Sequence, residues 1–202
     1  MGEAKTARLA ILVGTHGRGS NMAAIAEACA KREIPAEVAV VVAPSDAAPA
    51  LEVARGMGIE VAVVPYKAED YAPLLLGVLQ SKKCEILCLA GFMRLLPVEV
   101  LQAFPDRILN IHPALLPKHG GKGMYGMHVH EAVLAAGDKE SGCTIHYVNE
   151  RYDEGRIIHQ LRCPVEAGDT PETLAARVLA LEHRAYAKAL RIVIERNGRG
   201  TA

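Results

Sequence analysis

The stretch that decides the fold runs from residue 109 to residue 118 and reads Leu-Asn-Ile-His-Pro-Ala-Leu-Leu-Pro-Lys. Its first half is typical of the end of a buried strand, because apolar residues predominate there. Pro113 and Pro117 lack the backbone N–H that a strand ladder needs, so the strand is predicted to end near His112. Asn110 lies two positions before His112, and on an extended backbone both side chains leave the same face.

This amide and imidazole have two interpretations. In the simpler one, Asn110 and His112 only satisfy backbone groups where the strand gives way to a loop. In the other, the two side chains polarise a carbonyl group of a bound molecule. Position favours the second interpretation, because open α/β sheets bind ligands at the carboxyl ends of their strands.

Length and composition bound the class of protein. A chain of 202 residues, 50% of them hydrophobic, is long enough for one domain with a sizeable core. Lys plus Arg and Asp plus Glu both number 23, so no net field attracts nucleic acid or an anionic membrane. Residues 1–6 contain no apolar segment and no later apolar run approaches membrane-spanning length, which predicts a cytoplasmic location.

The cysteines and paired histidines predict neither a disulfide framework nor a metal site. The five cysteines are scattered and mostly flanked by apolar residues, which favours reduced core thiols. Cys84 and Cys88 lack nearby partners, and His128 and His130 lack a Cys or carboxylate at a metal-binding spacing. We therefore expect no metal.

Strand-like and helix-like segments alternate along the chain. Strands are expected at residues 8–13, 37–43, 61–64, 86–90, 108–112, 143–148 and 156–165. Helices are expected at residues 22–29, 47–56, 71–83, 97–103, 130–136 and 174 to about 196, where Asn197 and Gly198 end the last one. This order predicts an α/β fold with an open, mostly parallel twisted sheet, helices on both faces and an antiparallel edge toward the C-terminus. No repeat or linker divides the chain, so residues 1–202 are expected to form a single domain.

Residues 14–21, Gly-Thr-His-Gly-Arg-Gly-Ser-Asn, join the first predicted strand to the first helix. Their glycines let backbone amides approach an anion at a helix N-terminus, and Ser20 and Asn21 add donors. The stretch is either an ordinary N-cap turn or a phosphate site, and we favour a monophosphate. A dinucleotide fingerprint would need a third glycine where Met22 stands.

Residues 91–96, Gly-Phe-Met-Arg-Leu-Leu, follow the fourth predicted strand. A glycine at a strand end, followed by an aromatic and large apolar side chains, can wall a slot for a flat ring. An apolar turn tucked under a helix explains the stretch about as well.

Two further polar residues can converge on His112. His146 lies inside a predicted strand and Asp153 in the loop that follows. A carboxylate near an imidazole raises the pKa of the imidazole and helps it hold a proton. Aspartates in exposed loops are common, however, and the alternative for Asp153 is a turn former.

Four motifs, taken in order, resemble the phosphoribosylglycinamide formyltransferase family, the folate-dependent glycinamide ribonucleotide transformylases. They are Gly-Ser-Asn at 19–21, Leu-Ala-Gly-Phe-Met-Arg-Leu-Leu at 89–96, Asn-Ile-His-Pro-Ala-Leu-Leu-Pro at 110–117, and Asp153. The resemblance runs from about residue 9 to residue 194. It implies a formyltransferase-like variant of the Rossmann fold, with a phosphate-binding half at about 8–105 and a folate and catalytic half at about 106–196.

The resemblance also implies roles for individual residues. Asn110, His112 and Asp153 match the catalytic trio. The substrate phosphate would rest on Gly19, Ser20 and Asn21, and Glu182 would hold the glycinamide part, although a solvated helix residue is the alternative for Glu182. The folate would be bound by Met93, Arg94, Leu95, Leu96 and Asn110.

The chain departs from the family pattern at three places. The loop at 14–19 is longer than usual and carries Thr15 and His16 where the family often has a serine. Residues 119–126 are expanded and lack the common Tyr-Pro-Gly-Leu wording. A family arginine near the folate is replaced near Ala68, where Lys67 is a candidate substitute.

The implied reaction moves a formyl group from the co-substrate 10-formyltetrahydrofolate to the amine of 5'-phosphoribosylglycinamide in de novo purine biosynthesis. Direct attack would give a tetrahedral intermediate, with Asn110 and protonated His112 on its oxyanion and Asp153 keeping His112 protonated. The implied partners are these small molecules, with no nucleic acid and no membrane, for a monomer or a homodimer.

Three other functions compete with this one. A folate-dependent hydrolase and a methionyl-tRNA formyltransferase can use the same trio, but they are expected to carry an additional N-terminal regulatory or C-terminal basic domain. A non-catalytic nucleotide-binding module explains the first loop but gives Asn110, His112 and Asp153 no shared task.

Residues 119–126, His-Gly-Gly-Lys-Gly-Met-Tyr-Gly, contain four glycines just beyond the catalytic strand. Glycine does not favour a single rigid backbone, so the segment is either a surface excursion or a mobile lid that closes over ligands. We predict a lid in which Lys122 and Tyr125 cover the site.

Overall fold

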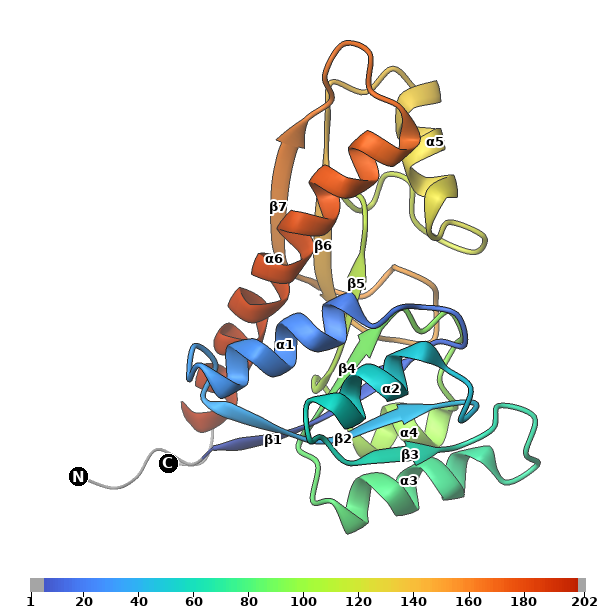
Figure 1. The fold of residues 1–202 in the computed structure, drawn as a ribbon, viewed down its shortest axis with the longest axis vertical. Helices are drawn as coiled ribbons and strands as arrows, with labels where there is room; N and C mark the ends of the chain where they lie inside the picture. The colour runs from blue at the N-terminus through green and yellow to red at the C-terminus, as the bar shows by residue number, and fades with distance from the viewer. Residues whose placement is uncertain (1–5, 200–202) are drawn as a thin grey trace.

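The computed structural model describes residues 6–199 and contains a seven-stranded sheet of order β3-β2-β1-β4-β5-β6-β7 (Figure 1). The strands are β1 (Ala7–Val13), β2 (Ala36–Ala43), β3 (Val61–Val63), β4 (Ile86–Ala90), β5 (Ile108–His112), β6 (Glu140–Tyr147) and β7 (Ile157–Pro164). The helices are α1 (Ser20–Ala30), α2 (Pro49–Gly56), α3 (Tyr71–Ser81), α4 (Val98–Ala103), α5 (Met127–Ala135) and α6 (Pro171–Arg199).

Strands β1 to β5 share one direction, and the direction then alternates at β6 and β7. Strands β1 to β5 pair in parallel, whereas β6 is antiparallel to β5 and β7 is antiparallel to β6. The predicted mostly parallel sheet with an antiparallel edge toward the C-terminus is therefore confirmed. The chain winds outward in opposite directions from β1 and β4, and open sheets bind ligands at the carboxyl ends of strands at such a switch point.

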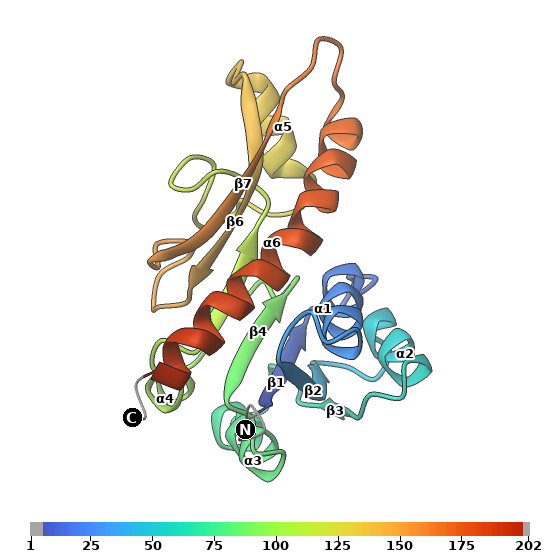
Figure 2. The ribbon, with the colours of Figure 1, turned by 90° about the vertical axis from the view of Figure 1, so that its left-hand side faces the viewer.

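Helices cover both faces of the sheet, as the apolar character of its strands requires. In Figure 1, α1 and α2 lie above β1 to β3, and α3 lies below them. Residues of α3 and α4 pack in the same core. Successive strand residues enter opposite cores: Ile11 packs in the core that contains residues of α1, α2 and α6, and Leu12 in the core that contains residues of α3 and α4. Figure 2 shows α6 running beside β6 and β7.

Most element boundaries lie within a few residues of the predicted ones, with two informative exceptions. Helix α5 begins at Met127, three residues before the expected start at His130, because Gly126 with φ 54° ends the loop and serves as the N-cap. Helix α6 continues through Asn197 and Gly198, so the predicted stop at these residues is wrong. A glycine inside a helix costs only about 1 kcal/mol relative to alanine, which a 29-residue helix tolerates.

A buried tyrosine fixes α6 against the middle of the sheet. The hydroxyl of Tyr186 lies 3.0 Å from the carbonyl oxygens of Leu89 in β4 and Leu109 in β5, and its side chain is 0% exposed. Glu182 lies four residues earlier on α6 and therefore on the same face of the helix. The anchor at Tyr186 thus also sets the position of Glu182.

The described residues contain few other candidate sites. All five cysteines are free thiols, with Cys88, Cys143 and Cys163 buried. Between residues 6 and 199 no group of three or more His, Cys, Asp or Glu side chains is arranged to hold a metal ion. Within the same residues, no helix has the length and apolar character needed to cross a membrane.

Candidate active site

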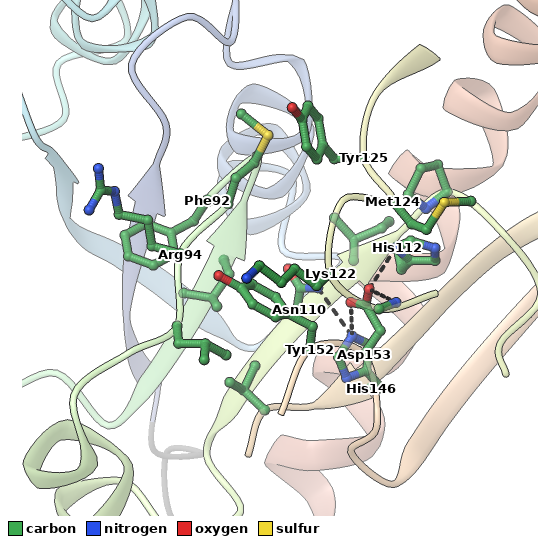
Figure 3. Close-up of a pocket in the computed structure, with 18 of the residues that line it drawn as sticks. Phe92, Arg94, Asn110, His112, Lys122, Met124, Tyr125, His146, Tyr152 and Asp153 are labelled. Carbon is green, nitrogen blue, oxygen red and sulfur yellow. Dashed lines mark hydrogen bonds and ion pairs between the residues drawn. The ribbon is translucent and has the colours of Figure 1, made fainter. Parts of the chain in front are cut away.

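A cavity of about 580 Å³ lies where the strand order reverses (Figure 3). The residues that line it come from segments that are far apart in sequence. They are Gly17, Asn21, Leu89, residues 91–95, residues 110–113, residues 121–126, His146, Val148, Asn149, residues 151–153 and Glu182. The cavity therefore brings together residues from each of the four motifs, although Gly19 and Ser20 of the first motif are not among the residues that line it.

Two glycines allow the loops after β1 and β4 to meet beside this cavity. A Cβ on Gly14 would lie 2.3 Å from the carbonyl oxygen of Gly91, so no larger residue fits at position 14 without a backbone shift. Gly91 itself has φ 75°, a left-handed conformation that glycine adopts without strain. The predicted phosphate loop and the predicted ring-binding stretch are thus in direct contact.

The structure brings Asn110, His112 and Asp153 together. Asn110 and His112 are both in β5 and both line the cavity, as their spacing predicts. Oδ2 of Asp153 lies 3.4 Å from Nδ1 of His112, and the two side chains are 11% and 4% exposed. Asp153 has φ 57°, a left-handed conformation that aspartate tolerates better than most residues. The carboxylate is thus close enough to act on the charge of the imidazole.

Hydrogen bonding and burial set the protonation state of His112. Its Nε2–H donates to the carbonyl oxygen of His119 at 2.7 Å, so in the neutral ring Nδ1 carries the lone pair. Burial lowers the pKa of His112, and the opposing effect of the Asp153 charge does not compensate, so the net shift is downward. Asp153 acts in the predicted direction, because its charge raises the pKa of His112, but burial makes the net shift in the free protein downward.

Asp153 is ionised in this environment. Burial raises the pKa of its carboxyl group, but the neighbouring His146, whose Nε2 lies 3.5 Å from Oδ1, the nearby His112 and the Gly121 N–H together lower it below its usual value. The Gly121 N–H donates to Oδ2 at 2.9 Å. The catalytic trio therefore combines a neutral imidazole with a buried negative charge.

His146 orients the amide of Asn110. Nδ1–H of His146 donates to the carbonyl oxygen of Tyr147 at 2.9 Å, which leaves Nε2 as an acceptor. Nδ2 of Asn110 donates to that Nε2 at 3.1 Å. Because an amide nitrogen has two hydrogens, Asn110 keeps one N–H for another acceptor. The sequence pointed to His146 as a neighbour of His112, and its contact with Asn110 was not predicted.

Thr144 fixes the segment that follows β5. Its hydroxyl donates to the carbonyl oxygen of Ala114 at 2.6 Å and accepts from the N–H of Leu116 at 3.1 Å. Nε2 of Gln160 lies 2.9 Å from the same hydroxyl and 3.0 Å from the carbonyl oxygen of Leu116. Thr144 is 0% exposed. The backbone just after the catalytic strand is therefore tied to both antiparallel strands.

The predicted phosphate turn forms the start of α1. Gly19 is the N-cap, with φ 78°, and no side chain caps the helix N-terminus among the residues described. A Cβ on Gly19 would lie 2.9 Å from Cβ of Ala50. Both the positive φ and the lack of space therefore require glycine at this position. An uncapped helix N-terminus presents backbone N–H groups and a positive dipole end to an anion.

Asn21 contacts Glu182 instead of serving as a free donor at this turn. Nδ2 of Asn21 donates to Oε2 of Glu182 at 2.6 Å. Glu182 is 8% exposed, and burial raises the pKa of its carboxyl group, with the Asn21 hydrogen bond lowering it only in part. The alternative of a solvated helix residue is therefore wrong for Glu182. The side chain of Asn21 links the turn to this carboxyl group.

The predicted folate stretch divides between cavity and core. Met93 and Leu95 are 52% and 44% exposed and line the cavity together with Arg94. Leu96 is 5% exposed and packs in the core with α4, so its predicted place in the slot is wrong. The side chain of Leu96 belongs to the core that contains residues of α3 and α4, where an apolar residue completes the packing.

An aromatic group supports the same wall. The guanidinium of Arg94 lies 4.7 Å from the centre of the Tyr66 ring, and the Phe92 ring packs edge-on against Tyr66 with centroids 5.4 Å apart. Lys67 is exposed and is not among the lining residues, so it contributes nothing to the cavity in this structure. Sequence reasoning missed Tyr66 here and Tyr152 on the cavity wall, because neither lies in a recognisable pattern.

The glycine-rich segment 119–126 is anchored at its beginning. Nε2–H of His119 donates to Oδ2 of Asp138 at 2.8 Å, and the Gly121 N–H is bonded to Asp153. Lys122 and Tyr125 are exposed and line the cavity (Figure 3). A mobile lid can therefore include residues 122–126 but not the anchored residues before them.

A family model described as formyl transferase matches residues 7–190. The chain belongs to the formyl transferase family.

Individual relatives show which members of the formyl transferase family this chain is similar to. A phosphoribosylglycinamide formyltransferase of Arabidopsis thaliana, described as chloroplastic, is 44% identical over 198 residues, which cover 96% of this chain and 67% of that protein. The enzyme of the same name from Escherichia coli (strain K12) is 37% identical over 180 residues, 87% of this chain and 82% of that one. The crystal structure of glycinamide ribonucleotide transformylase 1 from Symbiobacterium toebii superposes with a TM-score of 0.86 at 40% identity, covering 94% of this chain and 88% of that chain. The resemblance predicted from the motifs is confirmed.

Proposed function

We propose that this formyl transferase moves the formyl group of 10-formyltetrahydrofolate to the amine of 5'-phosphoribosylglycinamide, a step of de novo purine biosynthesis. The observation that carries the proposal is the meeting of Asn110, His112 and Asp153 beside one cavity. The proposed chemistry uses the side chains of this trio.

The cavity has separate regions that suit the two substrates. The N-terminus of α1 and the Gly19 turn suit a phosphate, and Glu182 suits the polar glycinamide part. The exposed apolar side chains of Met93 and Leu95 suit the flat pteridine of the folate. Asn110 and His112, at the end of β5, would then lie between the amine and the formyl group.

In the proposed reaction the amine nitrogen attacks the formyl carbon directly. A new C–N bond forms, the formyl oxygen becomes an oxyanion in a tetrahedral intermediate, and the bond from the formyl carbon to the folate nitrogen then breaks. The proton lost by the amine is gained by the departing folate nitrogen. No covalent intermediate with the protein is needed.

Asn110 would stabilise the oxyanion with the N–H that His146 leaves unused. His146 holds the amide in one orientation, so the donor is in place before charge develops. A preorganised donor of this kind is typically worth roughly 3–4 kcal/mol of transition-state stabilisation.

His112 would hold the moving proton at Nδ1. Its Nε2–H is already donated to His119, so Nδ1 is the ring atom that can gain a proton. Burial lowers the pKa of His112 in the free protein, whereas an oxyanion beside the ring and the charge of Asp153 both favour the protonated form. The imidazolium would therefore form as the oxyanion forms, and through water Asp153 would help to pass the proton to the folate nitrogen.

The proposal includes three further points. Residues 1–202 act as a single domain, which is supported by a cavity lined from both residues 8–105 and residues 106–196. The location is cytoplasmic. The enzyme acts as a monomer or a homodimer on small-molecule substrates.

An assay of tetrahydrofolate release tests the proposal. The protein is supplied with 10-formyltetrahydrofolate, with or without phosphoribosylglycinamide, and with His112→Ala as a matched control. We expect release only when the wild-type protein and the amine are both present. Release without the amine would instead identify a hydrolase, and absence of release in every mixture would identify a binding module.

A further inference from the structure

One short segment, residues 118–121, contacts both His112 and its neighbour Asp153. In residues 118–121, the carbonyl oxygen of His119 accepts the Nε2–H of His112, and the N–H of Gly121 donates to Asp153. A Cβ on Gly120 would lie 2.5 Å from Cδ2 of Leu116 and 3.2 Å from Cβ of Asp153, so the segment is closely packed. The backbone of this segment thus holds both partners of His112.

The segment does not adopt this path without strain. His119 has φ 52°, a left-handed conformation that is unfavourable for a residue with a Cβ. Such a conformation persists only when surrounding contacts hold it in place. Its carbonyl is the group that accepts the His112 hydrogen bond, so the strained residue and the functional contact coincide.

A single carboxylate anchors this segment from the side opposite the cavity. Oδ2 of Asp138 accepts from Nε2–H of His119 and Oδ1 accepts from Nζ of Lys118, each at 2.8 Å. The side chain of Asp138 is 18% exposed and that of His119 is 16% exposed, so this contact is largely shielded from solvent. Lys118 is 67% exposed, so its ion pair with Asp138 is the weaker of the two contacts.

Asp138 is itself held firmly. It follows the C-terminus of α5, where Gly137 has φ 66° and the N–H of Asp138 donates to the carbonyl oxygen of Val133 at 3.3 Å. Strand β6 begins two residues later at Glu140. A carboxylate between a helix end and a strand is a fixed point against which a strained loop can be held.

We propose that Asp138 is a positioning residue for the reaction: through His119 and Lys118 it holds residues 118–121 so that their backbone keeps His112 and Asp153 in place. Asp138 does not line the cavity that contains the catalytic trio. It acts indirectly, by fixing the carbonyl group of His119, which orients the imidazole of His112. The proposal rests on the function proposed above for its effect on turnover, but not for its effect on His112 itself.

The test compares Asp138→Ala and Asp138→Asn with the control Glu140→Gln. Glu140 is an acidic residue of the same region whose partner, Arg162, does not contact residues 118–121. Two measurements are made on each protein: steady-state kinetics with both substrates, and the side-chain NMR signals of His112 in the absence of substrate. The second measurement needs no catalysis, so failure of the proposed function and failure of this inference are distinguishable.

We expect Asp138→Ala to lower kcat by roughly tenfold to a hundredfold, as misplacement of a catalytic group does, with little change in either KM. The NMR titration of His112, which is faced by Asp153, His146, His119 and His130, should shift in the same variant. Asp138→Asn retains one acceptor oxygen and should show smaller changes of both kinds, and Glu140→Gln should show none.

Wild-type kcat in Asp138→Ala would overturn the inference, and so would unchanged His112 signals alongside a lower kcat. Equal losses in Glu140→Gln would also overturn it, because they would indicate a general effect of charge. If Asp138→Ala fails to fold, Asp138→Asn decides the question by the same two measurements.

Discussion

Nδ1 of His112 and Oδ2 of Asp153 lie 3.4 Å apart, in side chains that are 4% and 11% exposed. This separation exceeds the roughly 3.2 Å limit of a good hydrogen bond, but it is short enough for strong electrostatic coupling. The imidazole is therefore near a compensating charge without sharing a proton with it in the free protein. The following predictions depend on this arrangement and on the segments that maintain it.

His112→Ala should lower kcat by roughly a hundredfold to a thousandfold, because the interaction with the oxyanion develops in the transition state. Substrate dissociation constants, measured by calorimetry, should change little. Near-normal turnover in a folded variant would remove His112 from the mechanism.

Asp153→Asn should lower the pKa of His112 further. Burial already lowers that pKa, and the charge of Asp153 is the largest effect that opposes burial. The pH at which activity depends on the protonation state of His112 should therefore be lower in the variant than in the wild type. NMR titration of His112 measures the shift directly, and identical titrations in the two proteins would show that no coupling exists.

Glu182→Gln should change the pH dependence of stability and weaken binding of the ribonucleotide, two effects that are measured separately. Burial raises the pKa of Glu182 in the folded protein, so the folded state binds more protons than the unfolded state and loses stability as pH rises through that pKa. The variant lacks this ionisation, so its unfolding temperature relative to wild type should rise from acidic to mildly alkaline buffer, while its KM for the ribonucleotide increases. Glu195→Gln, on an exposed site of the same helix, is the control. An identical pH dependence in wild type and Glu182→Gln would contradict the prediction.

Gly14→Ala should destabilise the fold, because the added Cβ would lie 2.3 Å from the carbonyl oxygen of Gly91. Overpacking of this kind typically costs about 1–3 kcal/mol of unfolding free energy, measurable by urea denaturation. Gly17→Ala, in the same loop, meets nothing within 4 Å and should leave that free energy nearly unchanged. Similar values for the two variants would mean that the two loops can separate at no cost.

Residues 122–126 should become protected from hydrogen exchange when the ribonucleotide and a folate analogue bind together. Lys122 and Tyr125 line the cavity and are exposed, so they have room to close over ligands. The N–H of Gly121, which donates to Asp153, should be protected already in the free protein, which provides an internal control. Unchanged exchange of 122–126 at saturation would leave this segment as a surface insertion.

The fold was predictable because its signals are local. The alternation of apolar runs with amphipathic ones predicts β1 to β5 and their helices, and the Asp- and Gly-containing connection at residues 149–155 predicts the antiparallel edge. Proline and glycine define loop ends well but not helix ends inside a long amphipathic segment. The prediction that Asn197 and Gly198 end the helix was therefore wrong, because the intrinsic free-energy cost of glycine in α6 is small compared with the stability that the rest of the helix contributes.

The site was predictable only in part, because its energetics depend on contacts between distant residues. The spacing of Asn110 and His112 places both on one face of β5, and no long-range information is needed for that. The burial that lowers the pKa of His112, and the contact of Asn21 with Glu182 across 161 positions, have no signature in the local sequence. Leu96 is a similar case, since only the packed core determines which apolar residue of a run turns away from a cavity.

The hydrogen bonds of Thr144 have a consequence for inhibitor design. They tie the backbone at Ala114 and Leu116 to two strands, so the adjoining Pro113, which lines the cavity beside His112, is held in place and presents the same shape to every ligand. The cavity is also lined by exposed, flexible side chains such as Met93 and Lys122, which can rearrange around a bulky substituent. A compound that takes its affinity from the rigid wall at Pro113 and directs its variable groups toward Met93 and Lys122 should therefore discriminate best among enzymes that share the Asn-Ile-His-Pro sequence.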